Sequence, residues 1–283
     1  MRLLQLLLKS KTGTVGAVLV LLVILVALFA PLLATHDPAK LDPLLRLKPP
    51  MWLEGGSAEH LLGTDNLGRD IYSRIVYGAQ VSLIVGIGAV LVSGAIGGIL
   101  GLLSGYYGKW IDAIIMRIAD SLLAIPTILL MLVVLAVVGP GLMTLILVIG
   151  ATSWVSYARV VRGEVLSLKE RDFVKAAKGV GAPNRRILFK HILPNVISSF
   201  IVVSGMNVAT TIIMEASLSF LGLGIKPPAV SWGGMLSDGR QYIATSWWVA
   251  TFPGLAITIT VLGVIFLGDW LRDVLDPRMK VKG

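Results

Sequence analysis

The chain has 283 residues, of which 55% are hydrophobic and only 14% charged, and its formal net charge is +9. Soluble domains carry about 25% charged residues, so this composition excludes an ordinary soluble domain and indicates a protein surrounded by membrane lipid. The positive charge does not indicate a nucleic-acid partner, because lysine and arginine also gather on the cytoplasmic side of membrane proteins and no aromatic residues interleave with a basic stripe.

A helix needs about 20 apolar residues to cross the hydrocarbon core of a bilayer. The first uncharged run is longer than the apolar core of a signal peptide, so we expect a membrane anchor there. The run at 121–158 is interrupted by Gly139-Pro140-Gly141, which predicts two spans joined by a tight turn. Nearly uncharged runs thus predict six transmembrane helices, at residues 12–35, 75–107, two within 121–158, 192–223 and 247–267.

The distribution of basic residues predicts which side of the membrane each loop occupies. With six spans, 18 of the 25 lysine and arginine residues fall on the side that holds both termini. Basic residues favour the cytoplasmic side, so we expect an all-α integral membrane protein with both termini in the cytoplasm. The predicted parts are residues 1–35 (tail and first span), 36–74 (an extracytoplasmic segment) and 75–283 (five spans with a cytoplasmic loop at about 162–191).

A stripe of glycines runs along the second predicted span, at Gly94, Gly97, Gly98, Gly101 and Gly105. Small residues four positions apart let helix backbones approach closely inside a membrane. The stripe predicts close packing, either within the chain or against a second subunit.

The segment 172–195, DFVKAAKGVGAPNRRILFKHILPN, is basic although long apolar stretches flank it. Phe173, Ala176, Ala177 and Val180 share one face of a predicted helix. A face this small suits a groove on a protein partner better than a lipid surface, although an ordinary solvated basic loop would also fit. We expect a turn at the following glycines and a second helix that begins with Pro183.

This segment resembles the cytoplasmic coupling loop of ABC importer permeases, whose pattern is Glu-Ala-Ala, three residues, Gly, nine residues and Ile-x-Leu-Pro. Lys175 stands at the glutamate position and His191 at the isoleucine position, so an ion pair through that glutamate is not expected here. The residues that match or carry the predicted docking face are Phe173, Lys175, Ala176, Ala177, Gly181, Leu193 and Pro194.

Further stretches resemble the C-type permease of the dipeptide, oligopeptide and nickel importer family. They are HLLGTDNLGRDIYSRIVYGAQVSL (60–83), SFLGLGIKPP (219–228), SWGGMLSDGRQYI (231–243) and GDWLRDVLDPR (268–278). The resemblance implies a type I ABC importer permease fold in the bacterial inner membrane. It also implies a heterodimer with a B-type permease, two ATPase subunits that bind ATP and Mg²⁺, and an extracytoplasmic substrate-binding protein.

The resemblance implies import of dipeptides or oligopeptides, with nickel chelates or oligosaccharides as alternatives. The chain has no phosphate-binding motif Gly-x-x-x-x-Gly-Lys-Ser/Thr and no triad or metal-protease pattern, so we expect neither a cofactor on this chain nor an enzyme. An ion-coupled carrier, the alternative of another class, would need several ionisable groups at mid-membrane.

Glu215 is the only ionisable residue well inside a predicted span. A charge in that position is costly and faces a cavity or a partner, which leaves two interpretations, the translocation path or gate and a buried contact between helices. The isolated histidines His36, His60 and His191 lack metal-ligand spacing, and there is no cysteine. We therefore expect structural histidines and no metal site. The turns at 63–65 and 68–70 are expected to be structural or to contact the binding protein.

Overall fold

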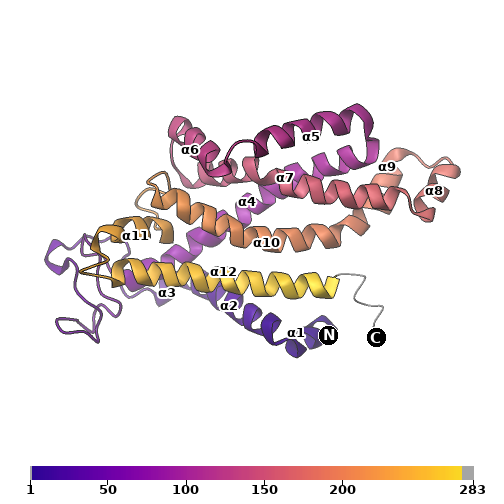
Figure 1. The fold of residues 1–283 in the computed structure, drawn as a ribbon. Helices are drawn as coiled ribbons and strands as arrows, with labels where there is room; N and C mark the ends of the chain where they lie inside the picture. The colour runs from indigo at the N-terminus through magenta and orange to yellow at the C-terminus, as the bar shows by residue number, and fades with distance from the viewer. Residues whose placement is uncertain (1, 276–283) are drawn as a thin grey trace.

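The computed structural model describes residues 2–275, with side chains from Gln5 onward, and every regular element in that range is helical. Figure 1 shows a long bundle, with α8 and α9 at one end and the segment 36–70 together with α11 at the other. The elements are α1 Arg2–Lys9, α2 Lys11–Leu28, α3 Ala30–Leu33, η1 Pro43–Leu45, α4 Ile71–Tyr107, α5 Lys109–Leu123, α6 Thr127–Val138, α7 Leu142–Lys169, α8 Asp172–Gly179, α9 Asn184–Arg186, η2 Ile187–Ile192, α10 Leu193–Phe220, α11 Trp232–Gly239, η3 Arg240–Tyr242 and α12 Trp248–Leu275.

Five helices in this range are long and apolar enough to cross a membrane: α2, α4, α7, α10 with the turns before it, and α12. The remaining crossing predicted from the sequence, the third in chain order, has a different form. Instead of one helix from residue 121, α5 and α6 meet at a bend of 87°. Pro126 caps the start of α6, and a helix of 12 residues is only about 18 Å long. By length and composition, the bent pair α5 and α6 fits either a third crossing made as a broken span or a re-entrant loop.

The glycine stripe of α4 packs mainly within the chain. A Cβ built on Gly97 would lie 2.3 Å from the carbonyl oxygen of Trp154, and one on Gly101 would lie 2.6 Å from that of Ala158, both in α7. Gly105 approaches α7 as closely. Gly98 instead faces the ring of Phe200 in α10. The close packing expected from the stripe is thus the contact between α4 and α7.

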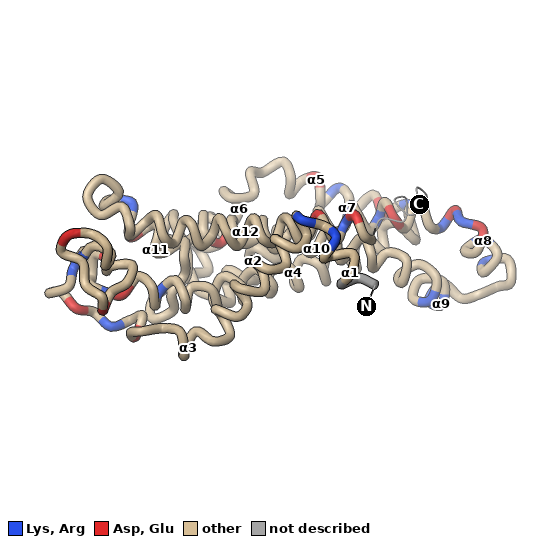
Figure 2. The backbone as a smooth tube through the Cα atoms, turned by 90° about the horizontal axis from the view of Figure 1, so that it is seen from below, with Lys and Arg blue, Asp and Glu red and all other residues tan. Residues whose placement is uncertain are grey.

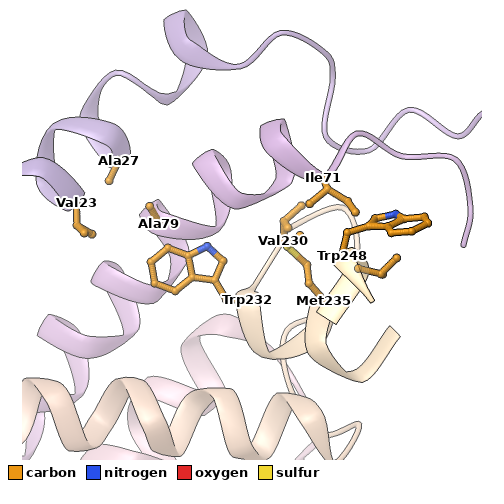
Figure 3. Packing of buried hydrophobic residues seen from close by; sticks show 9 residues of the cluster. Val23, Ala27, Ile71, Ala79, Val230, Trp232, Met235 and Trp248 are labelled. Atoms are coloured by element: carbon orange, nitrogen blue, oxygen red, sulfur yellow. The ribbon is translucent and has the colours of Figure 1, made fainter. Parts of the chain in front are cut away.

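The end of the bundle opposite α8 is organised around two tryptophans. The indole N–H of Trp232 donates to the carbonyl of Ile75 at 2.9 Å, and that of Trp248 donates to the carbonyl of Thr64 at 3.2 Å. Figure 3 shows Trp232 beside Ala79 of α4, with Trp248 near Ile71 and Val230. These contacts fix the segment 36–70 against α4, α11 and α12.

Charged residues are unevenly distributed along the bundle. Figure 2 shows the lysine, arginine, aspartate and glutamate positions mostly toward its two ends, with long uncharged stretches between. The helix α1 and the end of α12 lie toward the end that carries α8 (Figure 1). The basic residues after position 275, which the sequence predicts to be cytoplasmic, lie outside the described residues.

Candidate coupling site

The helix α8 follows α7 directly and lies at the extremity of the bundle (Figure 1). The helix α7 continues to Lys169, so it extends into the range of about 162–191 predicted as the cytoplasmic loop. Lys175, at the glutamate position of the family pattern, places its Nζ 3.2 Å from the carboxylate of Glu170. Both side chains are largely exposed, and ion pairs of this kind contribute little to stability.

One side of α8 packs onto the rest of the protein. Val174 is fully buried in a cluster with Tyr106 of α4, Val165 of α7 and Ile187 of η2, and Ala177 is half-buried against the same cluster. The periodicity had placed Ala177 on the docking face and had not singled out Val174. Burying an aliphatic side chain of this size contributes about 1.5–3 kcal/mol, so Val174 is the main anchor of α8.

Polar contacts also hold α8 and α9 against the end of α4. The Tyr106 hydroxyl donates to the side-chain oxygen of Asn184 at 2.7 Å, which connects α4 to α9. The ammonium of Lys178 lies 5.5 Å from the centre of the Tyr106 ring, within range of a cation–π interaction. One tyrosine at the end of α4 therefore contacts both helices that flank the turn, α8 and α9.

The opposite side of α8 carries exposed apolar residues, which we call the exposed strip: Phe173, Ala176 and Val180. Val180 is 84% exposed. Three of the four residues predicted to share a docking face thus remain on the surface. A strip of apolar side chains flanked by charges has the composition of a surface that packs into a protein groove.

The turn after α8 requires glycine. The N–H of Ala182 donates to the carbonyl of Ala177, and the N–H of Gly181 donates to that of Lys178, which is the Schellman pattern of helix ends. Gly181 occupies its left-handed position with φ +75°, where a Cβ is unfavourable. The sequence predicted this turn. Pro183 is the N-cap of α9, one position earlier than expected.

The residues Leu193 and Pro194 join the turn to α10. Proline has no N–H to donate to the carbonyl one turn earlier, and the chain before it forms the π-helix η2, with Leu193 N–H bonded to the carbonyl of Leu188. The Asn195 amide donates to the carbonyl of His191 at 2.7 Å. The helix therefore continues from α9 through η2 into α10 without a loop, which gives α8 a stiff connection to a membrane span.

A charged contact near the same end joins α5 to α7. Two nitrogens of the Arg162 guanidinium, Nε and Nη2, donate to the Asp112 carboxylate, at 2.6 and 2.7 Å, and the Ser104 hydroxyl donates to the same carboxylate. Two parallel hydrogen bonds between guanidinium and carboxylate are among the stronger polar contacts in proteins. The sequence alone offered no signal for this pair, because its partners are 50 residues apart.

Glu215 lies in α10 near its far end, away from α8. Its side chain is buried, and its Oε1 accepts a hydrogen bond from the Ser219 hydroxyl at 2.6 Å. Ser231, before α11, lies 3.4 Å from Ser219, whereas Oε2 of Glu215 has no hydrogen-bond partner among the described residues. A Cβ on Gly233 would lie 2.6 Å from the backbone of Ala216. The carboxyl group is thus enclosed where α11 packs tightly against α10.

The sequence matches known family models over most of its length. Residues 97–281 match the binding-protein-dependent transport system inner membrane component family, and residues 2–50 match the N-terminal transmembrane domain of oligopeptide transport permease C. The chain belongs to this family of inner-membrane transport components and is a multi-pass membrane protein. Its N-terminal match confirms the resemblance to the C-type permeases.

Individual relatives are similar over nearly the whole chain. The dipeptide transport system permease protein DppC of Alkalihalophilus pseudofirmus is 46% identical over 96% of this chain and 88% of its own length. The glutathione transport system permease protein GsiD of Pectobacterium atrosepticum is 45% identical over 96% of this chain and 89% of its own. A chain of the inward-facing MetNI methionine ABC transporter superposes with a TM-score of 0.58 at 20% identity, over 72% of this chain and 96% of that one. This likeness confirms the expected ABC importer permease fold.

Proposed function

We propose that this chain is one of two membrane-spanning subunits of an ATP-driven, binding-protein-dependent importer of dipeptides or oligopeptides. Its partners would be a B-type permease, two cytoplasmic ATPase subunits that bind ATP and Mg²⁺, and an extracytoplasmic substrate-binding protein. The observation that carries the proposal is the exposed strip of α8, an apolar surface at the tip of the bundle on a helix otherwise fixed by Val174. Relatives above 40% identity named for dipeptides and glutathione support a peptide substrate.

In the proposed mechanism, α8 lies in a groove of an ATPase subunit and transmits its movement. Closure of the ATPase pair on ATP would displace α8 together with α9, because Tyr106 and the buried cluster around Val174 hold the turn as one unit. The displacement would pass through η2 into α10, since the helix has no loop between Asn184 and Phe220. Tilting α10 against α4 would then open one side of the translocation path and close the other.

The substitution Ala176→Glu tests this proposal. Ala176 is exposed, so a carboxylate there does not disturb the packing of α8 on its own chain, whereas at the half-buried Ala177 it would. We expect the variant to reach the membrane in normal amount but to retain at least tenfold less ATPase subunit on purification, with a matching loss of uptake. Burying an unpaired charge in a protein groove opposes docking.

Ser167→Glu is the matched control. Ser167 is exposed on the neighbouring helix α7, so this substitution adds the same charge outside the exposed strip. This control should retain ATPase and uptake. If Ala176→Glu also kept both at the level of the unaltered protein, α8 would not be the docking element.

A further inference from the structure

Three side chains that bind metals elsewhere meet at the end of the bundle opposite α8. His36 follows α3, His60 lies in the segment before α4, and Asp70 is the N-cap of α4. Their ligand atoms all lie within 4.8 Å of one another. The histidines are 24 residues apart and isolated in the sequence, whereas the fold places their rings 4.6 Å apart between centroids.

The spacing of the ligand atoms suits a metal ion of the size of zinc. Nδ1 of His60 lies 3.0 Å from Oδ1 of Asp70, and Nδ1 of His36 lies 3.9 Å from Oδ2 of the same carboxylate. Zinc binds nitrogen and oxygen at about 2.0–2.2 Å in tetrahedral geometry, which places neighbouring ligand atoms roughly 3.3 Å apart. The two separations lie on either side of this value but end on different oxygens of Asp70, and the three candidate ligand atoms lie within 4.8 Å of one another. Binding of one ion would therefore draw the side chains together.

The ligands are held in place by their surroundings. Oδ2 of Asp70 accepts a hydrogen bond from the N–H of Ser73 at 2.8 Å, and the hydroxyl of Ser73 accepts one from the N–H of His36 at 3.0 Å. The carboxylate and the His60 ring are buried, while the His36 side chain is 33% exposed. Hydrogen bonds of this kind orient metal ligands and raise affinity.

A small cavity gives the cluster access and a favourable charge. It has a volume of about 250 Å³ and is lined by the three ligands together with the charged residues Asp37, Lys40, Asp42 and Glu59. Including Asp70, four carboxylates face one ammonium group, a balance that attracts a divalent cation. The cavity also offers room for water or a further carboxylate as the fourth ligand.

We propose that His36, His60 and Asp70 form a binding site for one divalent transition-metal ion of the zinc class. Imidazole and carboxylate together suit zinc and its neighbours, whereas magnesium and calcium prefer oxygen ligands alone. Binding would replace the contact between His60 and Asp70 and the 3.0 Å contact between His36 Nδ1 and the Thr35 hydroxyl. The ion would fasten the end of the first span to the start of α4. This site is independent of the proposed peptide transport.

Zinc titration of the purified full-length chain, without a histidine tag and after treatment with a chelator, tests the proposal. We expect one zinc ion per chain, with a Kd of micromolar or lower, and a rise in melting temperature with zinc but not with millimolar magnesium. His36→Ala removes a partly exposed ligand and leaves His60 and Asp70 in contact. This variant should bind zinc at least tenfold more weakly and lose the rise in melting temperature.

His191→Ala is the matched control, since this histidine lies in η2 at the other end of the bundle, and it should behave as the unaltered chain. X-ray absorption at the zinc edge of the unaltered chain gives a readout that needs no variant to fold, and should show two imidazole ligands and at least one oxygen. Absence of binding, equal affinity in His36→Ala, or a zinc environment without two imidazoles would overturn the proposal.

Discussion

Glu215 shows how an ionisable residue inside a membrane span can serve as a contact between helices. Its Oε1 accepts from Ser219, and Ser231 extends the hydrogen-bonded group toward α11. The surrounding packing is close, because Gly233 leaves no space for a Cβ against Ala216. Of the two interpretations drawn from the sequence, the buried contact requires such a hydrogen-bonded group, and the translocation path requires the carboxylate itself.

Substitutions at Glu215 distinguish the two interpretations. In Glu215→Gln the amide oxygen still accepts from Ser219, so we expect unchanged assembly, melting temperature and uptake. Glu215→Ala leaves the Ser219 hydroxyl without its acceptor and should destabilise the protein by about 1–3 kcal/mol, measured as a lower melting temperature in detergent. If Glu215→Gln lost uptake while its melting temperature stayed the same, the carboxylate would belong to the translocation path.

At the scale of single elements, α4 packs closely along α7, and glycine makes this approach possible. Gly97 and Gly98 are neighbours in the sequence but face different helices. A Cβ on Gly97 would overlap the backbone of α7, whereas one on Gly98 would lie 3.3 Å from the ring of Phe200, which can move aside. Both substitutions to alanine gain the same helix propensity, so they differ only in what the methyl group meets.

We therefore expect Gly97→Ala to destabilise the protein by about 1–3 kcal/mol through overpacking. Gly98→Ala should be neutral or slightly stabilising. Melting temperatures of the two purified variants, measured in the same detergent, check the difference. Equal melting temperatures would mean that α4 and α7 can separate without cost and that the stripe serves another contact.

The sequence predicted the elements whose signals are local. Uncharged length identified the spans, and the pattern of apolar residues and glycine predicted α8 and its turn at Gly181. It did not predict the bend between α5 and α6, because the apolar run at 121–138 is continuous and only Pro126 marks the break. It also placed Ala177 on the surface, since helical periodicity cannot tell which neighbouring side chain, here Val174, becomes the anchor.

Contacts between distant positions decide the structure of the outer segment, and single-sequence patterns do not contain them. Asp65 pairs with Arg69 at 2.6 Å, and Arg69 also reaches Asp238 at 2.9 Å, 169 residues away. The convergence of His36, His60 and Asp70 arises in the same way. The motifs at 60–70 were thus recognised as turns, while the ligand cluster within them became visible only when the fold brought α3 beside the start of α4.

At the scale of the whole molecule, the proposed function requires the two ends of the bundle to lie on opposite sides of the membrane. The chain has no cysteine, so a single introduced thiol is a unique label. Leu44 in the outer segment is 92% exposed, and Val180 at the end of α8 is 84% exposed. The segment 36–70 and α8 lie at opposite ends of the bundle (Figure 1), and each of the two exposed positions accepts a cysteine without loss of packing.

The excess of basic residues at the α8 end predicts that this end is cytoplasmic. In spheroplasts, a membrane-impermeant maleimide should therefore label Leu44→Cys and leave Val180→Cys unlabelled. In inside-out vesicles from cells that make this subunit alone, the pattern should reverse, because no ATPase covers α8 there. Between Leu44 and Val180 lie α4, the bent pair α5 and α6, and α7, which give three crossings if the bent pair is one span. Labelling of both thiols from one side would mean an even number of crossings between them. Labelling with the opposite sidedness would place α8 outside, where it cannot meet a cytoplasmic ATPase.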